Sequence, residues 1–151
     1  MNHADREVLL VESEPVVSEV TAFRLELLGY RVICVDSAEA ALMKISESTP
    51  DLVITDLVLP GLDGIGFIER LMTAKETTDL RIMVLSIDAD LSRVQAAHDA
   101  GAKDFIVVPF HPEVLEEKVS KLLANAPVQD RSEKAKTIEA VPAVTQALTA
   151  N

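Results

Sequence analysis

The sequence predicts a doubly wound α/β domain in which five parallel strands alternate with five helices. Two observations carry this prediction. Five short runs are almost continuously Val, Ile and Leu, as strands buried on both faces of a parallel sheet are. Segments with the apolar spacing of amphipathic helices separate these runs. Right-handed crossovers are then expected to set all five strands in one sheet.

The five apolar runs differ from the helical segments in being short and continuous. They occupy residues 7–12, 31–35, 51–55, 81–86 and 104–108. All are far shorter than the ~18 residues of a membrane span, and residues 1–8 lack the apolar region of a secretory signal. Cys34 is the chain's single cysteine, and its place in the second run predicts a small buried strand residue. No disulfide framework is available, which favours a reducing, cytoplasmic location.

The predicted helices follow each run in turn. They span residues 15–28, 37–48, 65–74, 89–100 and 112–124. In the first, Val20, Phe23 and Leu27 give one apolar face, and the Gly29 that follows is a typical helix stop. Asp36 and Glu39 resemble a capping box at the start of the second. Leu91 is expected on the apolar face of the fourth.

Charge and composition divide the 151 residues into a domain, 1–125, and a tail, 126–151. The tail has three acidic and three basic residues, so the whole net charge of −11 belongs to the domain. Such an acidic domain argues against nucleic acid or an anionic membrane as a direct partner. The tail's apolar residues have roughly helical spacing that Pro142 interrupts. It is therefore expected to be disordered, or to form a helix that docks on a partner or on the domain.

Polar residues follow the apolar runs at the strand ends where α/β sheets form their sites. Glu12 and Ser13 follow the first run, Asp56 follows the third, and Ser86 ends the fourth. We expect Glu12, Asp56 and Ser86 to converge on one rim of the sheet. Like charges crowded together are costly, so several carboxylates there indicate a site for a cation.

Four motifs within residues 6–125 resemble the receiver domain of two-component response regulators. They are VESEP after the first run, DLVLPGLDG at residues 56–64, the hydroxyl residue Ser86, and GAKDFIVVPF at residues 101–110. The resemblance implies a flavodoxin-like fold, with parallel strands in the order 2-1-3-4-5. The acidic ESEP turn and the PGLDGIGF loop do not fit the phosphate loops of flavin or dinucleotide sites. Ser13 also lacks the context of a hydrolase nucleophile.

The resemblance assigns the phosphoryl chemistry to the strand ends. Asp56 occupies the phosphoacceptor position, and Glu12 and Ser13 occupy the acidic pair that holds Mg²⁺. Ser86 occupies the position of the hydroxyl that hydrogen-bonds the phosphoryl group. Ser13 replaces an aspartate of the family, which removes one negative charge from the metal site. A weak Mg²⁺ site, or none, is therefore expected.

The same resemblance assigns the fifth strand to switching. Phe105 occupies the aromatic switch position, and Val108 occupies the position of the family's lysine. Valine can neither carry a charge nor donate a hydrogen bond, whereas phosphoryl transfer depends on positioned cations. The two replacements, Ser13 and Val108, identify the chain as an atypical member of the family.

Two functions remain open from the sequence. The first is an atypical, single-domain receiver, a pseudo-receiver that is not an enzyme and acts through protein contacts with impaired or absent phosphorylation. The alternative is a conventional receiver that a histidine kinase phosphorylates at Asp56 in a phosphorelay. The expected partners are signalling proteins, either the kinase or a downstream protein. A homodimer through the face formed by the fourth helix, the fifth strand and the fifth helix is also considered, whereas a solvated charged face is the simpler reading.

Overall fold

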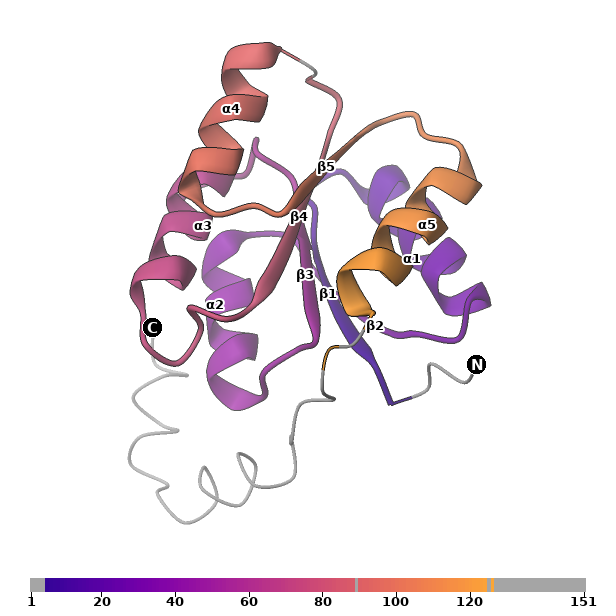
Figure 1. The fold of residues 1–151 in the computed structure, drawn as a ribbon, viewed down its shortest axis with the longest axis horizontal. Helices are drawn as coiled ribbons and strands as arrows, with labels where there is room; N and C mark the ends of the chain where they lie inside the picture. The colour runs from indigo at the N-terminus through magenta and orange to yellow at the C-terminus, as the bar shows by residue number, and fades with distance from the viewer. Residues whose placement is uncertain (1–4, 89, 125, 127–151) are drawn as a thin grey trace.

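The computed structural model describes residues 5–88, 90–124 and 126, and ten elements alternate along this part of the chain (Figure 1). The strands are β1 (Glu7–Val11), β2 (Arg31–Val35), β3 (Leu52–Thr55), β4 (Arg81–Ser86) and β5 (Asp104–Val107). The helices are α1 (Pro15–Leu27), α2 (Ala38–Glu47), α3 (Gly64–Thr73), α4 (Leu91–Ala100) and α5 (Pro112–Leu123). All ten predicted elements are confirmed, with ends within two residues of the prediction. The expectation for 127–151 lies outside the described residues.

The strands form one parallel sheet in the order β2-β1-β3-β4-β5, as predicted. Helices α2, α3 and α4 cover one face, and α1 and α5 cover the other (Figure 1). Successive strand residues point to opposite faces, so Leu9 and Val11 contact the first helix layer while Val8 and Leu10 contact the second. This burial on both faces explains the continuous apolar runs. No helix in the described segments has the length and apolar character needed to cross a bilayer.

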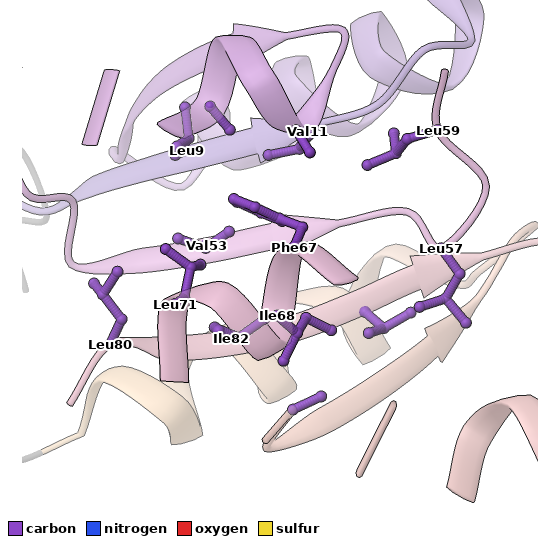
Figure 2. Packing of buried hydrophobic residues seen from close by; sticks show 14 of the residues in the cluster. Leu9, Val11, Val53, Leu57, Leu59, Phe67, Ile68, Leu71, Leu80 and Ile82 are labelled. Atoms are coloured by element: carbon purple, nitrogen blue, oxygen red, sulfur yellow. The ribbon is translucent and has the colours of Figure 1, made fainter. Parts of the chain in front are cut away.

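Phe67 is the largest side chain in the fully buried core. It extends from α3 toward Leu9, Val11 and Val53 of the sheet, and Leu71 lies one turn further along the helix (Figure 2). Aliphatic residues fill the remaining space, because the chain has no Trp and only four Phe. This core fixes α3, and with it the loop that joins β3 to α3.

The predicted capping box at α2 is wrong. The Ser37 hydroxyl caps the helix by accepting a hydrogen bond from the Ala40 N–H at 3.1 Å. Glu39 instead reaches out of the helix and accepts from the Leu62 N–H at 2.9 Å, which ties α2 to the loop before α3. Serine, like Asp, is a strong N-cap residue, so local sequence alone did not separate the two adjacent candidates.

The predicted core-facing residues of α1 and α4 are also partly wrong. The core face of α1 consists of Thr21, Ala22 and Leu25, whereas Val20, Phe23 and Leu27 are exposed. Leu91, at the first turn of α4, is 84% exposed. Apolar residues occur on both faces of α1, so their spacing did not identify the buried face. Gly29 ends the helix region with a positive φ of 99°, as expected.

Cys34 is exposed, contrary to the prediction. It lies on β2, which pairs with β1 on one side only and is an edge of the sheet. Its side chain borders a cleft beside the start of α1 instead of packing under a helix. A short apolar run gives no sign of whether its strand is central or at an edge.

Candidate functional site at the carboxyl edge of the sheet

The rim residues predicted from the sequence begin one residue beyond the ends of β1 and β3. The Glu12 N–H donates to the Val35 carbonyl, and the Asp56 N–H donates to the Val11 carbonyl, both at 3.0 Å. These two bonds continue the sheet ladder past the strands. They therefore set the Glu12 and Asp56 backbones side by side at the carboxyl edge.

The carboxyl groups of Glu12 and Asp56 are in direct hydrogen-bonding contact. Glu12 is 5% exposed, and burial raises the pKa of its carboxyl to about 7, with the charge of Asp56 and the hydrogen bond to it adding to the rise. The Glu14 N–H donates to Glu12 Oε2 at 3.1 Å and opposes this rise. Protonation of Glu12 near neutral pH therefore relieves its repulsion with Asp56.

Asp56 is held by the start of the loop that follows it. Its Oδ1 accepts from the Leu57 N–H at 2.6 Å and from the Val58 N–H at 3.3 Å. On its other side, the backbone carbonyl of Asp56 lies so close to Gly64 that a Cβ there would collide with it. The side chain is half-buried, so one part of the carboxylate is fixed and the other faces the rim.

Ser13 is exposed next to this pair. With Glu12 it lines a cleft of about 520 Å³ between the start of α1 and the β2–α2 loop, where Glu19 and Asp36 also lie. Asp56 does not line this cleft. The structure thus joins Glu12 to Asp56 directly and leaves Ser13 beside them on the solvent side.

The donor set of Glu12 and Asp56 fits what Mg²⁺ usually requires from a protein. Mg²⁺ is usually held by one or two carboxylates together with waters and phosphate oxygens, and Glu12 and Asp56 supply two carboxylates. Within the described segments, no group of three or more His, Cys, Asp or Glu side chains converges as a metal site. The residues present are therefore compatible with a Mg²⁺ site built on these two carboxylates.

Ser86 is buried at the end of β4, with its Oγ accepting from the Asp88 N–H at 3.2 Å. Its carbonyl accepts from the Val108 N–H at 2.9 Å, which extends the β4–β5 ladder by one pair. Phe105 is half-buried in β5, packs against the α2–α4 core layer and lines a 270 Å³ cavity beside α4. Ser86 thus lies at the same edge of the sheet as Asp56. Phe105 lies further from this edge, because it pairs with Val84, two residues before Ser86.

Val108 is half-buried. It packs against the core layer of α1 and α5, precedes Pro109 through a cis peptide bond, and lines an apolar groove next to α1. Across residues 5–88, 90–124 and 126, the identified ion pairs join other carboxylates, and neither Glu12 nor Asp56 is paired with a Lys or Arg. Val108 therefore contributes packing and no charge at this edge of the sheet.

Two features of the site were missed from the sequence. One is the close approach of Gly64 to the Asp56 carbonyl, for which the only sequence signal is the glycine itself. The other is the groove that Val108 shares with α1, whose signal is the presence of large apolar residues on both faces of that helix.

Comparison with known proteins gives a consistent result. Residues 8–120 match the response regulator receiver domain family. A probable transcriptional regulator, ycf27, from Porphyridium aerugineum is 33% identical over 116 residues, which cover 77% of this chain and 47% of that protein. The chain thus spans about half the length of the curated relatives it matches.

Solved structures agree in fold. The signal receiver domain of a signal transduction histidine kinase from Syntrophus aciditrophicus matches with a TM-score of 0.76 and 30% identity, covering 83% of this chain and 95% of that one. The receiver domain of sensor histidine kinase PA1611 from Pseudomonas aeruginosa PAO1, solved with magnesium in its active-site cleft, matches with a TM-score of 0.74 and 27% identity, covering 80% and 98%. From the match over residues 8–120 and the sheet order, this chain belongs to the response regulator receiver domain family of two-component signalling.

Proposed function

We propose that this receiver acts mainly through protein contacts and that Mg²⁺-dependent phosphorylation of Asp56 is impaired. The observation that carries the proposal is the environment of Val108. An apolar side chain packs against the α1 and α5 core layer at the position where the family has its lysine. Ser13, exposed beside Glu12, is the second replacement that supports it.

The physical argument concerns the charge on a phosphoryl group at Asp56. Transfer to a carboxylate oxygen brings negative charge next to Glu12 and Asp56, and fixed cations normally offset it. A unit charge pair at about 4 Å and an effective dielectric of about 20 interacts by roughly 4 kcal/mol. Even a third of that interaction energy corresponds to about a tenfold change in a rate or an equilibrium constant. Val108 has no charge and therefore supplies none of this electrostatic stabilisation.

A metal ion would supply the remaining positive charge when bound. Glu12 and Asp56 would hold it, with Ser13 contributing at most a neutral hydroxyl oxygen. The charge of Asp56 already raises the pKa of Glu12, so a cation at this pair would relieve that repulsion. Loss of one carboxylate from the site lowers the expected affinity without removing the site.

The alternative is a conventional receiver that a histidine kinase phosphorylates at Asp56. The specific observation in its favour is that Glu12, Asp56 and Ser86 still meet at one edge of the sheet. The magnesium-bound receiver domain of PA1611 is also similar over 80% of this chain.

Intact-mass measurement after incubation with acetyl phosphate and Mg²⁺ tests these functions. The samples are the parent chain, Asp56→Asn, and a chain with Ser13→Asp and Val108→Lys together. We expect the double variant to gain one phosphoryl group at least about tenfold faster than the parent, and Asp56→Asn to gain none. A parent that gains the phosphoryl group at the same measurable rate as the double variant would contradict the proposal and support the conventional receiver. A double variant as inactive as the parent would show that these two replacements are not the cause.

The partners of the proposed module are signalling proteins, with the face of α4, β5 and α5 as a candidate contact or dimer surface. On this face the Lys118 Nζ donates to Asp104 Oδ1 at 2.7 Å within the same protomer. Sedimentation velocity across the micromolar range checks for a dimer. A monomer throughout would remove self-association from the proposal.

We place the protein in the cytoplasm with no direct nucleic-acid or membrane contact through this domain. The domain's net charge of −11 supports this placement, since it repels phosphate backbones and anionic lipids. The matched relative is a probable transcriptional regulator, but the similarity covers only 47% of its length. Retention on immobilised DNA at physiological salt would contradict the placement.

A further inference from the structure

An apolar stripe runs along the outer face of α1. Four large apolar side chains are exposed there at successive helical turns, namely Val16 (65% exposed), Val20 (58%), Phe23 (64%) and Leu27 (61%). The opposite face of α1 packs on the sheet. A helix with apolar residues on both faces is typical of one that is covered on both sides.

The stripe borders a groove with an apolar floor. Val16, Val20 and Phe23 form one wall, and Val108, Phe110 and Pro112 of the β5–α5 segment form the other, around a volume of about 280 Å³. We call this the α1 groove. Val108 contributes no charge to its wall, and Arg24 is the one charged residue, among those the structure describes, that lines the groove.

Two buried polar atoms in the wall of the α1 groove lack a partner. Thr21 Oγ1 and Arg24 Nε are buried and make no hydrogen bond to any of the described residues. Buried polar atoms are nearly always satisfied in folded proteins. A chain segment seated in the groove presents backbone carbonyls, and the exposed side of the Arg24 guanidinium group is suited to donate to them.

We propose that residues 138–148 of this same chain dock in the α1 groove. This segment, IEAVPAVTQAL, has a single charged residue, Glu139. Its four largest apolar side chains are Ile138, Val141, Val144 and Leu148. An apolar, almost uncharged segment matches a groove whose lining is mostly apolar.

The tether between the domain and this segment has sufficient reach. The Ala126 carbonyl accepts from Arg6 Nη2 at 2.6 Å, and the Arg6 carbonyl in turn accepts from the Arg31 N–H at 3.0 Å, just after α1 ends. The chain therefore leaves the domain at the edge of the sheet where the stripe ends with Leu27. Residues 127–137 can span at most about 36 Å, while the 13 residues of α1 are about 20 Å long.

Charge favours this occupant over a second copy of the domain. Residues 126–151 carry three acidic and three basic residues, so the net charge of −11 lies in 1–125. Glu14, Glu19 and Glu26 on α1 are exposed, so two such faces would bring like charges together. A tethered neutral segment avoids that repulsion and is present at an effective concentration of about 1 mM.

A paramagnetic label tests the proposal on the full chain. The variant Cys34→Ser with Thr149→Cys carries a single nitroxide next to the segment, and amide signals of the ¹⁵N-labelled chain are compared before and after reduction of the nitroxide. We expect the amides of Val16, Val20 and Phe23 to lose most of their intensity in the oxidised form. Adding Phe23→Ser should restore that intensity. Adding Leu91→Ser, an exposed apolar change on α4, should leave the loss unchanged.

Three outcomes would overturn the proposal. The first is full intensity along α1 in the oxidised chain. The second is the same loss with and without Phe23→Ser, which would mean that the groove does not select the segment. The third is a loss of the same size when ¹⁵N-labelled chain without nitroxide is mixed with nitroxide-labelled chain, which would mean that the segment in the α1 groove comes from a second copy.

Discussion

The carboxyl groups of Glu12 and Asp56 share a hydrogen bond at the carboxyl edge of the sheet. Burial and the charge of Asp56 together raise the pKa of Glu12 to about 7, far above the 4.5 of a free glutamate side chain. This pair stores electrostatic repulsion that a proton or a cation can relieve, and it gives the domain a dependence on pH.

Glu12→Gln should stabilise the domain at pH 8 and change its stability little at pH 5. The pKa of Glu12 is raised in the folded state. Its favourable contribution to the stability of the folded domain is therefore fully present below about pH 4.5 and is lost as pH rises through about 7. A pKa shift of this size corresponds to about 3 kcal/mol in the free energy of unfolding, and solvent screening at the rim reduces this to about 1 to 2 kcal/mol. Urea unfolding at the two pH values measures the gain. Glu19→Gln, at an exposed carboxylate, is the control, and an equal gain at both pH values would contradict the assignment.

Val108→Lys should leave the fold intact and lower the free energy of unfolding by about 1 kcal/mol. Val108 packs against the α1 and α5 core layer, and the lysine stem can keep part of that contact while its ammonium group reaches solvent. The urea midpoint measures the change, with the neighbouring Val107→Lys, at an exposed residue, as the control. A midpoint equal to or above that of the parent would show that Val108 contributes no packing.

Gly64→Ala should cost about 1 to 3 kcal/mol and disturb the peptide between Asp56 and Leu57. A Cβ at Gly64 would collide with the Asp56 carbonyl and lie 2.6 Å from the Leu57 Cα, and backbone atoms cannot move aside cheaply. Gly66→Ala is the matched control in the same helix. Its Cβ would meet the flexible Leu62 side chain at 2.8 Å, so it should be tolerated. Thermal unfolding ranks the two, and equal melting temperatures would contradict the prediction.

Glu39→Ala should speed hydrogen exchange at the Leu62 amide and leave the Gly66 amide unchanged. The Leu62 N–H donates to Glu39, whereas the Gly66 N–H donates to Asp63 Oδ1 at 2.8 Å. The Leu62 hydrogen bond also lowers the pKa of Glu39, so its support of the loop is present at neutral pH and is lost as pH falls and the carboxylate is protonated. Amide exchange followed by NMR reads both positions. Unchanged exchange at Leu62 would show that Glu39 does not hold the loop.

The strands and helices were predictable because each leaves a periodic signal in the chain. β1 and β4 are buried on both faces and appear as unbroken apolar runs. The α3 residues Phe67, Ile68 and Leu71 are all buried on one side of the helix, as its apolar spacing indicates. The outer face of α1 was assigned wrongly, because that helix is apolar on both sides.

The sequence predicted which residues lie at the candidate site, but it did not predict the contacts between them. Strand-end position brought Glu12, Asp56 and Ser86 to one edge, as expected of a parallel sheet. The hydrogen bond between the Glu12 and Asp56 carboxyls depends on burial and side-chain direction, which residue spacing does not encode. The exposure of Ser13 and the packing of Val108 likewise depend on neighbours distant in the chain.

The sequence by itself determined the order of elements, the parallel sheet and the chemical identity of the strand-end residues. These follow from continuous apolar runs for the strands, from the 3.6-residue spacing of the helices, and from which residue stands where a strand ends. Only the tertiary structure decided that burial and Asp56 raise the pKa of Glu12, and that Val108 lines a groove with α1. The physical reason is that pKa values and exposed surface are set by desolvation and by contacts between segments far apart in the chain, which exist only once the sheet and its two helix layers have packed.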